Sequence, residues 1–398
     1  MEEKFQFQIL QKERETRARL GLLKTAHGLI KTPAFVPVGT LASVKSLSNQ
    51  ELEEIGTQVF FVNTYHLYLR PGLKVVRSFG GIHQFCGWKK ALMSDSAGFQ
   101  IFSLGEVNRK RRLSFRGEDL EAPLVKINSD GVIFRSHLDG SEHFFTPEKS
   151  IEIQTDLGTD IMIAFDECTF YPATYDYAKE ALERTHLWAK RCLEENQRLS
   201  GQRKYYQALY GVVQGGIFED LRKKSASFIS NLNFDGIAIG GVSVGESKEE
   251  MRKVLRWVIP GLPEEKPRHL LGVGEIDDIF SLVEEGVDTF DCVMPTRLGR
   301  MGHLLVKDSK LKDCGFTVDI AKAEFAEDSR PIDETCDCFV CKNYHRAYLH
   351  HLFRTKELLA YRLATYHNLY FLERLLKQIR QAIEEESLLQ LRKKWLEE

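Results

Sequence analysis

The sequence lacks any run of 18 or more apolar residues among its 398, so it offers no candidate membrane-spanning helix. It also lacks a strong excess of charge. Its 55 Lys and Arg against 57 Asp and Glu leave a formal net charge of -2, which argues against a generally basic nucleic-acid coat protein but not against a local basic surface. The acidic start MEEK, with no basic n-region, predicts a cytoplasmic protein.

Cysteine is scarce as well, with eight in the chain. Five of them are scattered, which excludes a disulfide framework in a chain of this size and agrees with a cytoplasmic location. The scattered thiols are Cys86, Cys168, Cys192, Cys292 and Cys314.

A strand-then-helix rhythm organises most of the chain. Eight short β-rich apolar runs occur, at residues 33–39, 59–67, 92–99, 161–168, 208–216, 236–244, 269–274 and 289–295. Helical patterns follow most of them, with start signals at Thr146-Pro147 and at Ser247 and one long amphipathic stretch over 175–199. This rhythm predicts an α/β fold, a (β/α)8 TIM barrel over residues 1–313, with an open doubly wound sheet as the alternative.

Polar residues recur at or just after the ends of five of these predicted strands. In a barrel the C-terminal strand ends meet at one mouth, where active sites lie, so we expect these side chains to share a site. The alternative, that each is an ordinary turn residue, loses weight when all five are taken together. They are Asn63, Asp95, Asp166, Gln214 and Asp291.

Two segments break the rhythm. Residues 105–132 are charged and aperiodic, which indicates an insertion or hairpin after the third strand. Residues 314–398 carry a cysteine cluster and then, from Arg346 onward, helical patterns. We interpret this region as an appended zinc-binding helical subdomain.

The cluster CDCFVC places Cys336, Cys338 and Cys341 in the pattern C-x-C-x2-C, which predicts a metal site. A tetrahedral zinc needs a fourth ligand, and spacing alone leaves four histidines open, namely His345, His350, His351 and His367. Four protein ligands would close the site, which favours an architectural metal over a catalytic one.

The chemistry suggested by the strand ends is that of a glycosidic bond. Asp95 and Asp291 would supply two carboxylates, one as nucleophile or electrostatic stabiliser and one to move protons on the leaving group. Arg297 and Arg300, just after the second carboxylate, are suited to grip phosphates.

A planar base would suit the rest of this predicted site. Asp166 and Gln214 could read a base edge by matching donors and acceptors, and the Gly240-Gly241 pair lets the backbone approach a planar ligand closely.

These stretches resemble the bacterial-type tRNA-guanine transglycosylases over nearly the whole chain. The resemblance is carried by TPAFVPVGT, NTYHLYLRPG, SDSAGFQIFSL, SHLDGSEHFFTPEKSIEIQ, AFDECTFYPA, GVVQGG, GGVSVGE, RHLLGVG, FDCVMPTRLGR and CDCFVCKNYHRAYLHHL. It implies a (β/α)8 barrel, usually a homodimer. It also implies one structural Zn²⁺ per subunit, with His367 as the fourth ligand.

The reaction implied is the exchange of the wobble guanine of G-U-N anticodon tRNAs (those for Asp, Asn, His and Tyr) for a deazaguanine base in queuosine synthesis. Asp291 would attack the ribose to form a covalent ribosyl-aspartate, and Asp95 would transfer protons. The resemblance implies base contacts by Asp166, Gln214 and the backbone N–H of Gly241. It further places Asn63, Ser96, Phe99, Leu271 and the carbonyl of Val242 beside the base.

The incoming base is expected to be the small 7-aminomethyl-7-deazaguanine (preQ1), with salvaged queuine as the alternative. Queuine users tend to have glycine where this chain has Val244, and a small aliphatic residue where it has Cys168. The β-branched Val244 is stiff and should act as a steric wall. The chain departs from the family at Ala97, where glycine is usual; we expect the turn there to be slightly re-aimed, because alanine tolerates any conformation with a negative φ.

Three rival functions follow from the same features. An archaeal-type relative would need additional C-terminal RNA-binding domains, which we do not find in the final helices. A catalytically dead partner subunit would lack Asp95 or Asp291, and both are present. A hydrolytic glycosidase could use the same acid pair, but the base-reading residues argue against a plain sugar site.

Overall fold

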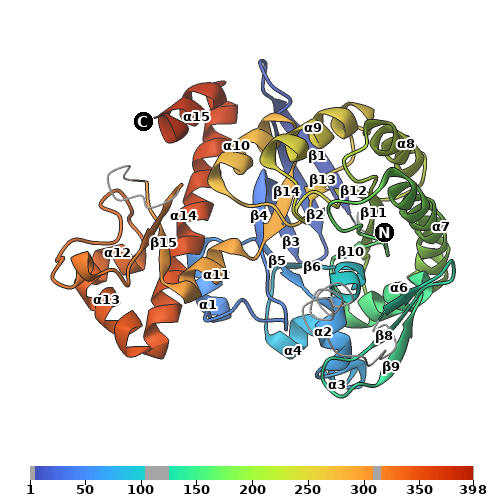
Figure 1. Ribbon diagram of the computed structural model, residues 1–398, viewed down its shortest axis with the longest axis horizontal. Helices are drawn as coiled ribbons and strands as arrows, with labels where there is room; N and C mark the ends of the chain where they lie inside the picture. Colours follow the sequence, from blue (N-terminus) through green and yellow to red (C-terminus); the bar gives the residue numbers. More distant parts are fainter. Residues whose placement is uncertain (1–4, 104–124, 308–314, 398) are drawn as a thin grey trace, which may run out of the picture.

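The computed structural model describes residues 5–103, 125–307 and 315–397. Its centre is a parallel sheet of eight strands that closes into a barrel (Figure 1). The N–H of Gly39 donates to the carbonyl of Phe61 at 2.7 Å and joins the first strand to the last. In order around the barrel the strands are β4 (Ala34–Pro37), β14 (Thr289–Cys292), β13 (Arg268–Leu270), β12 (Gly236–Ile239), β11 (Ala208–Val213), β10 (Ile161–Ile163), β6 (Ala91–Ser94) and β5 (Val59–Val62).

All eight predicted strands are therefore present, and the barrel prediction is confirmed over the open sheet. The strands were recognisable because a parallel sheet is covered on both faces, so its strands are continuous apolar runs. Strand β5, for example, is Val-Phe-Phe-Val with every residue buried. Each strand ends before its apolar run does, because the residues that follow leave the sheet to form the loops at the barrel mouth.

Helices surround the barrel (Figure 1). The predicted helix starts are confirmed: the Thr146 side chain accepts from the N–H of Lys149, and that of Ser247 from the N–H of Glu250. The helices of this part are α1 (Asn49–Ile55), α2 (Thr64–Leu69), α3 (Leu73–Ser78), α4 (Ile82–Cys86), α6 (Pro147–Leu157), α7 (Tyr175–Leu199), α8 (Glu219–Ser230), α9 (Lys248–Val258), α10 (Ile276–Glu284) and α11 (Met294–Met301). Residues 98–103 are also helical.

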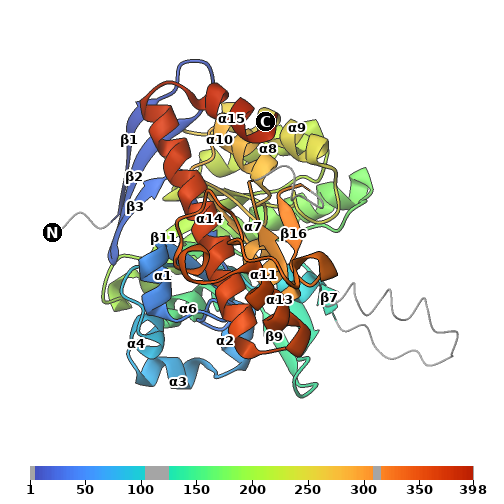
Figure 2. The same cartoon turned by 90° about the vertical axis from the view of Figure 1, so that its left-hand side faces the viewer.

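Two antiparallel sheets adjoin the barrel. The first, β1 (Gln6–Lys12), β2 (Arg19–Thr25) and β3 (Gly28–Thr32), is shown edge-on in Figure 2. The second, β7 (Val125–Ile127), β8 (Val132–Arg135) and β9 (Glu142–Phe145), follows the predicted insertion. Most of that insertion, residues 104–124, lies outside the described residues.

The first sheet is pinned to the barrel at the end opposite the mouth by a His27–Asp160–His83 cluster. Nδ1 of His27 lies 2.9 Å from Oδ1 of Asp160, and Nε2 of His83 lies 3.2 Å from Oδ2. The two imidazoles stack with centroids 3.7 Å apart and planes 21° apart. Because a metal lies in the ring plane of each imidazole ligand, stacked rings offer it no shared position. We therefore interpret this group as a structural contact that holds the first sheet against the barrel.

The C-terminal region forms the unit at the opposite side from α7 in Figure 1. Its elements are β15 (His303–Leu305), β16 (Thr317–Asp319), α12 (Phe339–Asn343), α13 (Arg346–Thr355), α14 (Leu358–Glu384) and α15 (Leu388–Leu396), which confirms the helical prediction after Arg346. The predicted domain boundary at residue 313 falls between β15 and β16, which pair with each other. Helix α14, beyond that boundary, packs on β4 and α11 of the barrel part. A division of the chain at residue 313 stays a prediction. In the part of the chain described, no helix is long and apolar enough to cross a membrane.

Candidate active site and metal centre

A cavity of about 400 Å³ opens at the C-terminal ends of the barrel strands. It brings together most of the residues singled out from the sequence: Asn63, Asp95, Ser96, Phe99, Asp166, Gln214, Gly241, Leu271, Asp291 and Arg297. Val242 and Arg300 do not line it. Val242 is buried and lines a neighbouring cavity instead.

Asp95 follows β6 and is held by three groups. Its Oδ2 accepts from the Asn63 amide at 2.5 Å, and its Oδ1 accepts from the N–H of Thr64 at 2.7 Å and that of Ala97 at 3.3 Å. Burial raises the pKa of Asp95 to about 7, against the lowering effect of these hydrogen bonds and with a contribution from the charge of Asp291. A carboxyl with a pKa near neutrality can both donate and accept a proton.

Ala97 corrects one expectation. Its φ is +71°, so the turn keeps a left-handed conformation and is not re-aimed to a negative φ that alanine would prefer. The residue is fully buried between Asp95 and the helix at 98–103, so the turn requires the conformation that the usual glycine adopts without strain.

Asp166 and Gln214 form a buried polar pair on another wall. Nε2 of Gln214 donates to Oδ2 of Asp166 at 2.7 Å, and the Ser96 hydroxyl donates to Oδ1 at 3.3 Å. Burial raises the pKa of Asp166 to about 6, although both hydrogen bonds oppose the rise. The Gln214 NH2 group retains a second hydrogen, and its Oε1 has no partner among the described residues.

The Gly240-Gly241 turn lies directly against Gln214. A side chain at Gly241 would come within 2.5 Å of Gln214 Oε1, and the φ of Gly241 is +62°, so both space and conformation require glycine. The fully buried Arg222 of α8 anchors the turn by donating to the carbonyls of Gly240 and Gly241, each at 2.8 Å. Sequence reasoning missed Arg222, because its pattern in LRKKSAS is that of a solvated helix face.

Asp291, at the end of β14, also has partners that the sequence did not reveal. Its Oδ1 lies 3.1 Å from the N–H of Gly272 and 3.2 Å from Nε2 of His269. His269 is fully buried on β13, in register with Thr289 of β14. The histidine lies inside an apolar strand, where only the strand register shows which neighbour it faces.

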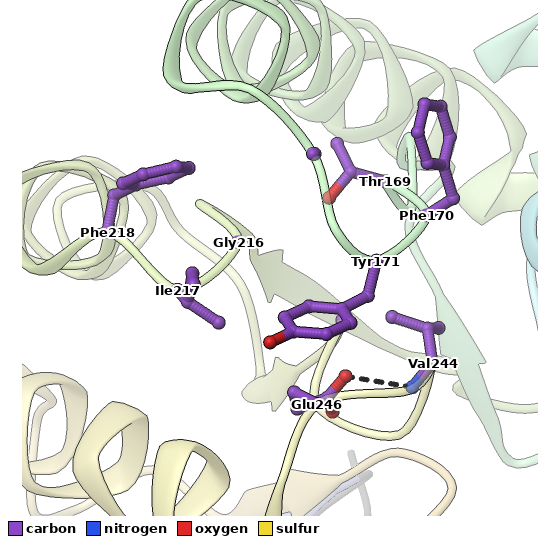
Figure 3. Close-up of a pocket in the computed structure, with 10 residues that line it drawn as sticks. Thr169, Phe170, Tyr171, Gly216, Ile217, Phe218, Val244 and Glu246 are labelled. Carbon is purple, nitrogen blue, oxygen red and sulfur yellow. Dashed lines mark hydrogen bonds between the residues drawn. The ribbon is translucent and has the colours of Figure 1, made fainter.

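One end of the cavity is bounded by Val244 and Cys168. Behind Val244 lies a hollow of only about 10 Å³, lined by aromatic side chains that include Tyr171 and Phe218 (Figure 3). The N–H of Val244 donates to Oε2 of Glu246 at 3.1 Å, which fixes the loop backbone. Burial raises the pKa of Cys168 to about 12, so its thiol stays neutral and unreactive.

The two arginines of α11 face different ways. Arg297 lines the cavity, whereas Nη1 of Arg300 donates to the carbonyl of Thr296 in its own helix at 2.6 Å. Phe99 stands at the rim with 49% of its surface exposed, and Leu271 lines the cavity as well.

Cys336, Cys338, Cys341 and His367 gather in a buried cluster, the Cys3His centre. Nδ1 of His367 lies 3.9, 3.5 and 3.4 Å from the three sulfur atoms in that order. Tetrahedral zinc, with bonds of about 2.3 Å to sulfur and 2.0 Å to nitrogen, would separate these atoms by about 3.5 Å, so the residues fit a zinc ion.

The rest of the centre supports a metal role for His367. Its Nε2 lies 2.7 Å from the carbonyl oxygen of Leu305, which fixes the proton there and leaves Nδ1 free to bind a metal. The neighbouring thiols hold the pKa of Cys338 well below its usual value. Of the other candidates, His345 is exposed and His350 is turned to the carbonyl of Ile320.

A (β/α)8 barrel whose open cavity holds two carboxylates and a buried Asp–Gln pair, with a separate Cys3His centre, defines a barrel enzyme suited to glycosyl transfer. The family model described as "Queuine tRNA-ribosyltransferase" matches residues 14–398. Relatives named queuine tRNA-ribosyltransferase are 48% identical in Caldanaerobacter subterraneus subsp. tengcongensis, 49% in Thermoanaerobacter pseudethanolicus and 49% in Halothermothrix orenii. Each alignment covers 98% of this chain and 96% of the relative. The chain belongs to the queuine tRNA-ribosyltransferase family, and its activity is that of a tRNA-guanine ribosyltransferase.

Proposed function

We propose that this enzyme exchanges the wobble guanine of G-U-N anticodon tRNAs for preQ1 through a covalent ribosyl-aspartate, as a step in queuosine biosynthesis. The observation that carries the proposal is the pairing of Asp95 and Asp291 in one cavity with the Asp166–Gln214 pair. The tRNAs would be those for Asp, Asn, His and Tyr.

In this mechanism Asp291 attacks C1′ of the wobble nucleoside as the bond from C1′ to the base breaks. The base departs with the electron pair and takes a proton from Asp95, whose pKa near 7 suits a group that must later accept a proton from the incoming base. The deazaguanine then displaces the carboxylate from C1′. Two inversions leave the original configuration at C1′.

The base would be read along its edges. The Asp166 carboxylate accepts from its N–H groups, while the second amide hydrogen of Gln214 and the N–H of Gly241 donate to O6. Phe99 and Leu271 would cover the two faces of the ring, since an aromatic face stacks on any base. Asn63 and Ser96 complete the wall by holding Asp95 and Asp166.

Two further groups would contact the substrates outside the guanine-like face. The backbone carbonyl of Val242 would accept a hydrogen bond from the aminomethyl group, while its side chain lines the neighbouring cavity. Arg297 and Arg300 would bind tRNA phosphates, with Arg300 first releasing the carbonyl of Thr296.

The preference for preQ1 rests on Val244, which bounds the cavity where the 7-substituent would extend. Exchange with salvaged queuine is the second candidate, and the name queuine tRNA-ribosyltransferase, which the relatives carry, favours it.

We also propose that the Cys3His centre holds one structural Zn²⁺ per subunit, because four protein ligands leave no position for a substrate. The resemblance supports a homodimer, and the free, scattered cysteines support a cytoplasmic location. Phe339 and Tyr348, which are 51% and 41% exposed beside this centre, supply an apolar surface that suits such a contact.

The proposal is tested by incubating the enzyme with a G-U-N tRNA and radiolabelled guanine. We expect label in the tRNA at the wobble position, and none in a tRNA whose wobble guanine is replaced by adenine. A hydrolytic glycosidase would release guanine without incorporating label, and a catalytically dead subunit would do neither.

A further inference from the structure

The buried ring of His269 bridges two side chains of the neighbouring strand. Its Nδ1 lies 2.9 Å from the Thr289 hydroxyl, and its Nε2 lies 3.2 Å from Oδ1 of Asp291. Thr289 and Asp291 are two apart on β14, so their side chains point to the same side of the strand. The register that pairs His269 with Thr289 thus places the ring beside the carboxylate.

This arrangement fixes where the imidazole carries its proton. A carboxylate only accepts hydrogen bonds, so Nε2 must be the protonated nitrogen that faces Asp291. Nδ1 then accepts from the Thr289 hydroxyl, which can turn its proton toward the ring. Phe61 stacks on the imidazole, with centroids 5.9 Å apart and planes 23° apart, and limits its rotation.

The two oxygens of Asp291 are consequently unlike. Oδ1 receives both the His269 and the Gly272 donors. Within the described ranges no donor contacts Oδ2, which leaves one oxygen of the carboxylate held and the other available for reaction.

We propose that His269, kept in the Nε2–H tautomer by Thr289, is a positioning residue that aims Oδ2 of Asp291 and stabilises the carboxylate when it leaves. The proposal rests on the proposed role of Asp291 as nucleophile. In the first half-reaction Oδ2 forms a bond to C1′, and the base departs with the electron pair of the broken C1′–N bond. In the second, the incoming base nitrogen bonds to C1′, and the electron pair of the C1′–Oδ2 bond returns to Asp291.

The donor on Oδ1 matters most in that second step, because negative charge returns to the carboxylate as the ester breaks. A fixed donor aimed at developing charge in a site of low polarity lowers the barrier. Loss of the donor should therefore slow breakdown of the covalent adduct more than it weakens binding of tRNA or base.

Three substitutions of His269 and one of Thr289 test the role. Glutamine places an amide nitrogen near the position of Nε2, asparagine places one near Nδ1, and leucine places none. We expect His269→Leu and His269→Asn to lower kcat by about 10- to 100-fold, with KM for tRNA changed by less than about twofold. His269→Gln should recover most of the loss. Thr289→Val, which frees the ring to take the other tautomer, should fall between them.

The rate at which the covalent adduct breaks down is a measurement that a simple packing defect would not change. After the tRNA adduct forms, added guanine should discharge it at least about tenfold more slowly in His269→Leu than in the unaltered enzyme, as followed on denaturing gels. The role is overturned if His269→Leu keeps kcat within about twofold, or if His269→Asn works as well as His269→Gln. Should His269→Leu not fold, the Gln and Asn variants carry the comparison, since both keep a polar side chain.

The Asp291→Asn variant separates this inference from the proposed function. If that variant still exchanges guanine, the nucleophile is elsewhere and both proposals are wrong. If it is inactive while His269→Leu is unimpaired, only the positioning role is overturned.

Discussion

Asn368 donates a hydrogen bond to the carbonyl oxygen of Pro295 at 3.0 Å. The same buried amide donates to the carbonyl of His303 and accepts from the N–H of Leu305. Asn368 is the neighbour of His367 in α14, and Pro295 lies in the first turn of α11, which follows Asp291 directly. The Cys3His centre and the segment that carries Asp291 are therefore joined through the side chain of Asn368.

This link predicts that loss of the metal reaches the active site. Cys338→Ser should bind no zinc and should lower the free energy of unfolding by roughly 4 kcal/mol or more, because metal-binding energy is folding energy. Exchange activity should fall together with zinc content, because α11 loses the support of α14. Zinc analysis and thermal unfolding of the purified protein provide the measurements.

His345→Ala is the matched control, since it removes a histidine that lies near the cluster in sequence but is exposed. It should keep one zinc per chain, whereas His367→Ala should not. Full zinc occupancy in His367→Ala together with loss in His345→Ala would reverse the ligand assignment.

Asp291→Asn should abolish both guanine exchange and the covalent tRNA adduct, with a loss of at least about 1000-fold, because an amide is a poor nucleophile. An amide oxygen can still accept from the N–H of Gly272, so the fold and the melting temperature should be unchanged. Denaturing gels with tRNA detect the adduct. An adduct that survives this change would point to Asp95 as the nucleophile.

The raised pKa of Asp95 predicts the pH dependence of adduct formation. A carboxyl with a pKa of about 7 is protonated below that pH and can donate to the leaving guanine, whereas above it the proton is lost. The single-turnover rate should therefore be level below pH 7 and fall about tenfold per pH unit above it. Asp95→Asn, which does not titrate, should be slow throughout. A rate that is constant from pH 6 to 9 would contradict the assignment.

The barrel was predictable because its eight strands are buried on both faces, so a single pattern carries each of them. The part of the cavity that is lined by polar residues at the strand ends was also predictable from the sequence. His269 was not, since its role depends on the register of β13 against β14. Nor was Arg222, because a charged residue in a helix is buried or solvated according to tertiary packing alone. Asn63, expected beside the base, also caps α2, which explains why the chain leaves the sheet after Val62, the last residue of β5.

Ala97 offers a test of local strain. Its φ of +71° costs an alanine more than a glycine, so Ala97→Gly should stabilise the protein by roughly 0.5–1 kcal/mol. The N–H that donates to Asp95 is retained, so exchange activity should not decrease. Chemical denaturation measures the difference. A destabilised Ala97→Gly protein would show that the methyl group contributes more by packing than it costs in conformation.

The proposed preference for preQ1 over queuine rests on Val244. The guanine-like face is common to preQ1 and queuine, so discrimination must come from the space beside the 7-substituent, where queuine carries a cyclopentenediol. A β-branched side chain in a close-packed wall cannot swing aside, and its backbone is tied to Glu246. The hollow of about 10 Å³ behind it is too small to receive the ring unless the wall is removed (Figure 3).

Val244→Gly should join that hollow to the cavity and shift the preference toward queuine by at least about tenfold, since one steric wall is worth about 1.4 kcal/mol or more. Competition between the two bases on one tRNA, read as the ratio of their kcat/KM values, measures the shift. Val242→Ala is the control on the same loop, because it shortens a side chain that does not line the cavity and keeps the backbone carbonyl that both bases would use, so it should leave that ratio unchanged. Equal or better use of queuine by the unaltered enzyme would refute the steric argument, and the enzyme would then be a queuine-salvaging member of its family.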